Sequence, residues 1–215
     1  MQIVVLPSGV SSDAPLSLQL VRGRPFIDWQ LDGFVASGAQ SVVLCVGALG
    51  EQIESHVRRA LDRGLSVSYS YDGGQLLGSG GTLRRAFARL EAEFVLTFAE
   101  RYLPFDYSAP LQDLHAHPEA LATMSVSRGA GSVALEGELV SSYDAGLQDF
   151  CSYGAIALRR SALDGIEDGA VWNLDALFRK LARQRKLRAF VAPEPAYDIG
   201  SPELEQHLAS HPVEL

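Results

Sequence analysis

The chain has 215 residues, of which 47% are hydrophobic, and its formal net charge is −8. This length and composition predict one domain with a substantial core, and the negative charge argues against a surface that binds nucleic acid. The apolar runs are strand-sized and shorter than the ~20 residues of a bilayer span, and Met1 leads directly into a predicted strand. We therefore expect a cytoplasmic protein without a membrane partner.

The first predicted element is a strand, Gln2 to Leu6, whose β-branched residues are typical of a buried position. In open α/β sheets, the loop after the first strand lies in the ligand crevice and approaches phosphate groups. Such a loop uses glycines and usually a Lys or Arg. Here the loop, Pro7 to Pro15, has one glycine, Gly9, and no basic residue. The strand and loop expected at a phosphate site are therefore present, but the basic residues expected in the loop are not.

Helical and strand patterns then alternate as far as residue 98. Helices are predicted at Phe26 to Ser37, Glu51 to Arg63 and Thr82 to Leu90, and strands at Val42 to Val46, Ser66 to Tyr71 and Phe94 to Phe98. This order predicts right-handed crossovers and an α/β fold with a doubly wound, mostly parallel sheet in three layers.

The second half of the chain is richer in strand patterns. We expect a helix at Ser108 to His117, a strand at Thr123 to Ser127, two short strands within Ser132 to Tyr143, a further strand at Phe150 to Leu158, a helix at Asn173 to Arg185, a strand at Leu187 to Val191 and a final helix at Glu203 to Ala209. Residues 123–158 are predicted to form a small β-rich insertion within a single domain of residues 1–215.

A glycine-rich turn precedes the helix that is predicted at Thr82. The run Gly78-Ser79-Gly80-Gly81 ends at a helix N-terminus, where unsatisfied N–H groups favour an anion or the edge of a base. A flexible connection with ordinary capping explains the same residues. Both interpretations stay open.

Two acidic residues are candidates for a metal site. Glu100 follows a strand that is predicted to be central, and Asp198 lies in a turn with Gly200 and Pro202. Two carboxylates from a strand end and a distant loop can share a Mg²⁺ with substrate phosphates. The alternative for such an acid is a helix cap or a solvated charge.

Other residue types restrict the chemistry further. The only lysines are Lys180 and Lys186, so no lysine in the first 179 residues can bind a phosphate. No serine lies in a Gly-x-Ser-x-Gly elbow, which leaves a hydrolase triad without support. Cys45 and Cys151 are far apart in the sequence, and we expect two free thiols.

Five segments, taken in order, resemble a known family. They are Gly23 to Leu31, Val43 to Gly47 with Gly50 to Ile53, Leu77 to Leu83, Tyr102 to Tyr107, and Tyr197 to Glu203. Their order and spacing resemble the sugar-1-phosphate nucleotidylyltransferases, especially the short bacterial type that activates hexose or heptose 1-phosphates. The resemblance covers nearly the whole chain and implies a nucleotidyltransferase fold.

The resemblance also implies a reaction and its ligands. In that family a sugar-phosphate oxygen attacks the α-phosphate of a nucleoside triphosphate and displaces pyrophosphate, with Mg²⁺ and basic side chains neutralising the charge. The implied ligands are a nucleoside triphosphate, a sugar 1-phosphate or a nucleotide sugar, and the implied cofactor is Mg²⁺. The residues assigned are Leu6, Gly9, Gly78, Gly80 and Gly81 to the nucleotide, Gly131, Tyr153 and Gly154 to the sugar side, and Glu100 and Asp198 to the metal.

The basic positions of the family pattern are missing from this chain. The family motif Leu-Ala-Gly-Gly-x-Gly-Thr-Arg corresponds to a shorter loop that begins at Leu6 and has no arginine. Leu16 stands at the position of the following lysine, and Ala145 at that of a sugar-phosphate lysine. Each such contact is worth roughly 100- to 1,000-fold in rate, by analogy with oxyanion-hole donors.

We therefore favour a catalytically degenerate protein that binds a nucleotide or nucleotide sugar, or that acts as a regulatory or structural partner of an active paralogue or within a homo-oligomer. The alternative is an active Mg²⁺-dependent sugar-1-phosphate nucleotidylyltransferase that recruits arginines from elsewhere, such as Arg22 or Arg24. A glycosyltransferase of related topology is a weaker third option, because Glu100-Arg101-Tyr102 contains no Asp-x-Asp motif.

Overall fold

The computed structural model describes residues 1–7, 14–59, 64–73 and 76–210, apart from the side chains of Ala145 and Leu147. Gly9, which the resemblance assigns to the nucleotide, lies outside these residues, and so does the side chain of Ala145 at the expected lysine position. Among the described residues, none of the helices combines the length and the apolarity needed to span a bilayer.

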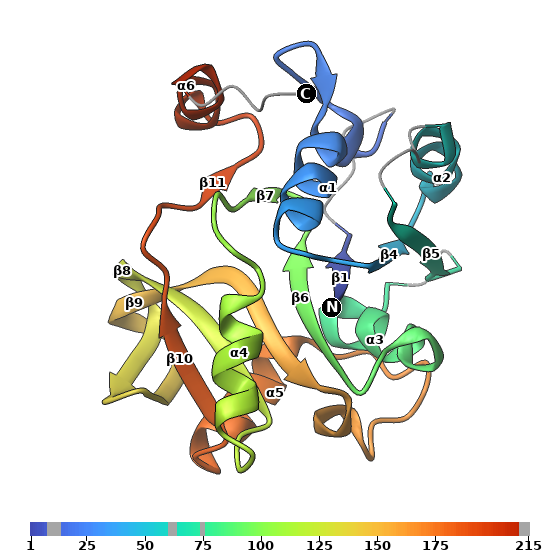
Figure 1. Cartoon of the computed structure of the whole chain (residues 1–215). Helices are drawn as coiled ribbons and strands as arrows, with labels where there is room; N and C mark the ends of the chain where they lie inside the picture. The colour runs from blue at the N-terminus through green and yellow to red at the C-terminus, as the bar shows by residue number, and fades with distance from the viewer. Residues whose placement is uncertain (8–13, 60–63, 74–75, 211–215) are drawn as a thin grey trace.

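A seven-stranded sheet forms the centre of the molecule, with the strand order β10-β8-β9-β6-β1-β4-β5 (Figure 1). The strands are β1 (Gln2–Leu6), β4 (Ser41–Val46), β5 (Ser66–Tyr71), β6 (Glu93–Phe98), β8 (Ala122–Glu136), β9 (Leu139–Arg159) and β10 (Leu187–Val191). Strands β5, β4, β1 and β6 pair in parallel, β9 runs antiparallel to β6 and β8, and β10 is parallel to β8. The predicted α/β fold with a mostly parallel sheet is confirmed.

Helices cover both faces of this sheet. They are α1 (Phe26–Ala36), α2 (Gly50–Arg59), α3 (Gly78–Arg85), α4 (Ala109–Ala116), α5 (Leu174–Arg183) and α6 (Pro202–Ser210). Successive residues of a strand point to opposite faces, so Val4 of β1 packs in a core cluster with α3 and α5, and Val5 packs in a second cluster with α1 and α4. The chain is therefore built as three layers.

Two small antiparallel sheets stand beside the central one. Strand β2 (Leu20–Val21) pairs with β3 (Arg24–Pro25), and β7 (Arg101–Tyr102) pairs with β11 (Tyr197–Asp198). The β7–β11 pair joins the residues after the central strand β6 to the turn before α6. It therefore places two distant parts of the sequence side by side at the carboxyl end of β6 (Figure 1).

The strands expected within residues 123–158 are fewer and longer than predicted. They are two strands, β8 and β9, which pair with each other through several register shifts between Met124 and Leu135. Bulges bend a strand without ending it, whereas in the sequence the glycines in this region resemble strand ends. The beginning of β8 and the end of β9 belong to the central sheet. That residues 123–158 form an insertion within a single domain stays a prediction.

Candidate functional site

The carboxyl end of β6 brings together the two acids that were predicted as metal ligands. Glu100 follows β6 by two residues, and Asp198 is in β11. Strand β11 pairs with β7 so that Asp198 lies opposite Arg101, and the amide of Ile199 donates to the carbonyl oxygen of Glu100 at 2.8 Å. The two carboxylates are thus neighbours because the backbones around them are hydrogen-bonded to each other.

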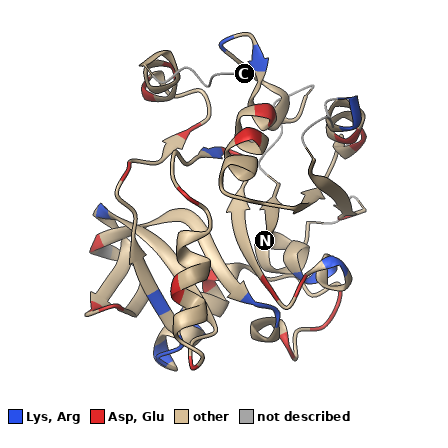
Figure 2. Ribbon diagram, in the orientation of Figure 1, with Lys and Arg blue, Asp and Glu red and all other residues tan. Residues whose placement is uncertain are grey.

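Arg101 places a positive charge beside these two acids. Its Nε lies 3.2 Å from Oδ1 of Asp198, and its Nη1 donates to the carbonyl oxygens of Ser152 and Tyr153 at 3.5 and 3.4 Å. Figure 2 shows the acidic and basic ribbon segments of β11 and β7 adjacent to each other. The guanidinium is therefore held by acceptors from two separate strands, β11 and β9.

Gly154 leaves the space that the Arg101 side chain occupies. A Cβ atom at Gly154 would lie 3.0 Å from Cδ of Arg101, and the backbone of Gly154 has a φ of +111°. A larger residue would be strained in this conformation whatever the space. Tyr153 and Gly154, which were assigned to the sugar side, thus contact Arg101.

Glu100 is more enclosed than Asp198. Its Oε2 is buried and has no hydrogen-bond partner among the described residues. Burial raises the pKa of Glu100 above its ordinary value, the Asp198 carboxylate raises this pKa further, and the Arg101 guanidinium opposes them. The charged form of Glu100 is therefore disfavoured in the folded protein.

These residues do not fit a resident Mg²⁺ as they are arranged. An unpartnered oxygen of Glu100 is a suitable donor for a divalent cation. However, the second expected ligand, Asp198, already has a guanidinium 3.2 Å away. That guanidinium neutralises the carboxylate and would repel a second cation at the same place.

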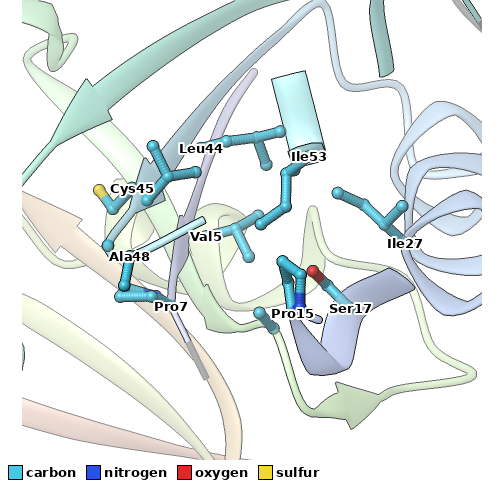
Figure 3. A pocket seen from close by; sticks show the side chains of 12 residues that line it. Val5, Pro7, Pro15, Ser17, Ile27, Leu44, Cys45, Ala48 and Ile53 are labelled. Atoms are coloured by element: carbon cyan, nitrogen blue, oxygen red, sulfur yellow. The ribbon is translucent and has the colours of Figure 1, made fainter. Parts of the chain in front are cut away.

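A small apolar cavity lies at the carboxyl ends of β1 and β4, under α1 and α2 (Figure 3). Its volume is about 50 Å³, and its lining includes Val5, Ile27, Leu44 and Ile53 but no charged residue among those that the structure describes. Small-molecule sites usually measure roughly 300–1,000 Å³. A nucleotide bound at this edge would extend beyond the cavity and would find no cation in the described part of its lining.

Leu16 lies next to this cavity. It begins a short 3₁₀ helix, Leu16–Leu18, and its neighbours Pro15 and Ser17 line the cavity. Leu16 itself is half-buried. A lysine at this position would bring a positive charge to the carboxyl edge of the sheet, whereas the leucine side chain is neutral.

Arg24, one of the arginines considered as a substitute cation, is held by α1. Its Nη2 lies 2.5 Å from Oδ2 of Asp32 and donates to the carbonyl oxygen of Asp28 at 3.1 Å. The guanidinium also stacks 5.0 Å from the ring centroid of Trp29. Moving Arg24 to a phosphate would break all three contacts.

The glycines at the start of α3 pack against another part of the chain. The amides of Gly80 and Gly81 donate to the carbonyl oxygen of Trp172 at 3.1 and 3.2 Å. A Cβ at Gly80 would lie 2.6 Å from the Trp172 ring, and one at Gly81 would lie 2.3 Å from the carbonyl oxygen of Ala170. A Cβ at Gly78 would lie 2.6 Å from the Trp172 carbonyl oxygen. This packing explains the glycines without a ligand, and their contact with a nucleotide stays a prediction.

Two further assigned residues lie within the core or a strand pair. Leu6 ends β1 and is buried in the cluster that includes α3 and α5. Gly131 is in β8, where a Cβ would lie 2.4 Å from the carbonyl oxygen of Phe150 in β9. Their packing accounts for both residue types, and the assignment of Gly131 to the sugar side stays a prediction.

Two residues of the carboxyl edge were not predicted as site residues. Arg101 is one, and Asp72, which directly follows β5, is the other. Asp72 is buried, its Oδ2 accepts a hydrogen bond from Thr82 Oγ1 at 2.6 Å, and burial raises the pKa of its carboxyl group. An acid directly after a predicted strand, the signal that identified Glu100, also marks Asp72.

Solved structures share this fold over nearly the whole chain. HddC from Yersinia pseudotuberculosis, complexed with GMP-PN, has a TM-score of 0.77 and 20% sequence identity, with 97% of this chain and 98% of that chain covered. The inositol-1-phosphate CTP transferase from T. maritima has a TM-score of 0.80 and 15% identity, with 100% and 98% covered. UDP-glucose pyrophosphorylase from Acinetobacter baumanii has a TM-score of 0.75 and 15% identity, with 98% and 94% covered.

No family model matches the chain. At these identities the neighbours show the fold alone, and that fold is the one found in sugar-phosphate nucleotidylyltransferases.

The packing of α3 against residues 170–172 gives a first prediction. Gly80→Ala is expected to lower the free energy of unfolding by about 1–3 kcal/mol, because the added methyl group overpacks the Trp172 ring. Gly33→Ala is the matched control, since Gly33 is in α1 and no atom lies within 4 Å of a Cβ there. It should stabilise the protein by about 0.4–1 kcal/mol. Urea unfolding measures both, and equal effects would contradict the packing argument.

The enclosed carboxyl of Glu100 gives a prediction on pH. Because burial raises its pKa in the folded protein, stability is greatest below the ordinary pKa and falls as pH rises through the raised value. Glu100→Gln removes this loss, so it should unfold a few degrees higher than the wild type at neutral pH. The difference should disappear below a pH of about 4, where the carboxyl is protonated in both states.

Thermal unfolding followed by circular dichroism checks this result. Glu167→Gln is the control, because Glu167 is an exposed loop residue, and it should show no such pH-dependent difference. A Glu100→Gln protein that is no more stable than the wild type at neutral pH would show that the charge on Glu100 is not disfavoured.

Proposed function

We propose that this chain is a catalytically degenerate nucleotidylyltransferase-like protein, which binds a nucleotide or nucleotide sugar in the cytoplasm without turning it over. The observation that carries the proposal is the pairing of Arg101 with Asp198. It joins the cation at the end of the central strand to one of the two acids that the resemblance assigns to the metal.

Positive charge near the phosphates is essential to the reaction of this family. Nucleotidyl transfer depends on positioning and on positive charge around the phosphates as pyrophosphate leaves. The described lining of the cavity at the β1–β4 edge is uncharged, Leu16 is neutral, and Arg24 is paired with Asp32. The described part of this edge thus offers little of the charge that the reaction needs.

The ligands bound by the structural neighbours support the class of ligand. One neighbour is complexed with GMP-PN, a UDP-glucose pyrophosphorylase is complexed with UDP-glucose, and a UGPase is bound to UTP. In each of these three ligands, phosphate groups are linked to a nucleoside. We infer that this chain takes a ligand of the same class, as a regulatory or structural component beside an active paralogue or in a homo-oligomer.

Binding and turnover can be measured separately. A panel of nucleoside triphosphates and nucleotide sugars should raise the unfolding temperature, with a stabilisation that grows with ligand concentration and reaches about 2.7 kcal/mol at 100 times Kd. The same triphosphates mixed with a panel of sugar 1-phosphates should release no pyrophosphate. Pyrophosphate release that Glu100→Ala abolishes would overturn the proposal, and so would the failure of the whole panel to stabilise the protein.

A single substitution tests the missing charge. Leu16→Lys should strengthen binding of a nucleoside triphosphate by about tenfold or more, because a hydrogen bond to a charged group is worth about 1.5–3 kcal/mol. Leu16 is half-buried, so a lysine can keep its stem covered and its amine in water. Leu20→Lys is the control. Leu20 is 62% exposed in β2, so this substitution adds the same charge at a different place on the surface. Equal effects of the two variants would show that only the net charge matters.

A further inference from the structure

We propose that Arg101 serves as a built-in cation at the Glu100–Asp198 pair, so that this edge of the sheet takes no divalent metal ion and presents a guanidinium to a phosphate-bearing ligand instead. The first half of the proposal, on the metal, stands independently of the proposed function. The second half, on the phosphate, rests on it.

The backbone fixes the position of Arg101. Arg101 and Asp198 lie directly opposite each other in the antiparallel β7–β11 pair. Side chains at opposite positions of such a pair project from the same face with Cβ atoms about 4.5–5.5 Å apart. The two side chains are therefore brought together by the pairing of their strands.

The surroundings of Arg101 are also suited to a cation. Besides Asp198, the carbonyl oxygens of Ser152 and Tyr153 face its Nη1. Gly154 has a left-handed backbone and no Cβ, and this gives the stem of Arg101 its space. One carboxylate, two carbonyl oxygens and a glycine thus converge on one guanidinium, from β11 and β9.

This arrangement conflicts with a divalent ion at the same carboxylates. Mg²⁺ binds carboxylates that carry their full negative charge and lie free to coordinate it. The Asp198 carboxylate is compensated by Arg101, which lies 3.2 Å away, and a divalent ion beside it would be repelled by that guanidinium. The ion and the ion pair are therefore mutually exclusive unless Arg101 leaves.

Arg101 keeps donors for a ligand. A guanidinium has five N–H donors arranged to bind two oxygens at once. The contacts seen use Nε and Nη1, and within the described residues no hydrogen bond of Nη2 is found. The side chain is 34% exposed, so a phosphate oxygen can approach it from solvent. Arginine binds phosphate in this way without a metal.

Binding of Mn²⁺ alone tests the first half, with the ion followed by electron paramagnetic resonance and no nucleotide present. The wild type is expected to bind Mn²⁺ no more tightly than Asp198→Asn. In Arg101→Gln, affinity should rise by at least about tenfold, because the carboxylates regain their full charge, and the double variant Arg101→Gln with Asp198→Asn should lose that gain. Arg160→Gln is the matched control, since it removes an arginine that donates to the carbonyl oxygen of Leu90 and has no ion pair among the described residues, and it should leave Mn²⁺ affinity unchanged.

Two results would overturn the metal half. The first is a wild-type protein whose Mn²⁺ affinity falls in Asp198→Asn, since the carboxylate would then hold metal beside Arg101. The second is a folded Arg101→Gln protein that gains no Mn²⁺ affinity, because Arg101 would then not be what excludes the ion. Asp198 is 66% exposed in its side chain, so Asp198→Asn is expected to fold even where Arg101→Gln does not.

The second half is tested with the nucleotide or nucleotide sugar that stabilises the wild type most. Its affinity should be the same in EDTA and in Mg²⁺, and should fall about tenfold or more in Arg101→Gln, because a charged hydrogen bond is lost. Arg160→Gln should bind it as the wild type does. Binding that requires Mg²⁺ would overturn this half, whereas the absence of any stabilising ligand would refute the proposed function and leave the Mn²⁺ result standing.

Discussion

The pairing of β7 with β11 is the constraint on which the candidate site depends. These strands have two residues each, yet they tie the chain after the central strand β6 to the turn that begins α6. Glu100 and Arg101 are consecutive in the sequence, and this pairing brings Asp198, which lies almost a hundred residues later, next to them. The same pairing sets Asp198 and Arg101 beside the enclosed carboxyl group of Glu100, where the aspartate raises and the guanidinium lowers the pKa of Glu100. A change of either neighbour therefore alters the electrostatic environment of Glu100.

The sequence predicts the strands of the regular part of the central sheet, but it does not predict the full length of the bulged strands β8 and β9. Strands β1, β5 and β10 have the predicted bounds, because each is an apolar or alternating run that is followed within two residues by a proline or a charged residue. For the region of β8 and β9 the sequence predicts shorter strands, because bulges and glycines inside a long strand resemble strand ends when the partner strand is unknown. Helix α3 begins at Gly78 instead of Thr82, since tertiary packing against Trp172 overrides the low helical propensity of glycine.

The candidate site was predictable only as a set of positions. An acid after a strand and an acid in a distant turn were found from their patterns, and the structure brings them together. What the sequence could not show is what each side chain is bound to. Glycine permits the close approach of either a ligand or another backbone, so the sequence alone does not distinguish these two roles for Gly80 and Gly81. In the structure their amides donate to the carbonyl oxygen of Trp172. The pairing of Arg101 with Asp198 depends on strand register across distant segments, which no local pattern encodes.

The fit between Gly154 and the stem of Arg101 couples two positions that lie more than fifty residues apart in the sequence. A Cβ at position 154 would lie 3.0 Å from Cδ of Arg101 and would also require a strained backbone. Residues in contact generally show non-additive effects when both are substituted. The steric part of the cost at position 154 is therefore set by the residue at position 101, whereas the backbone part is not.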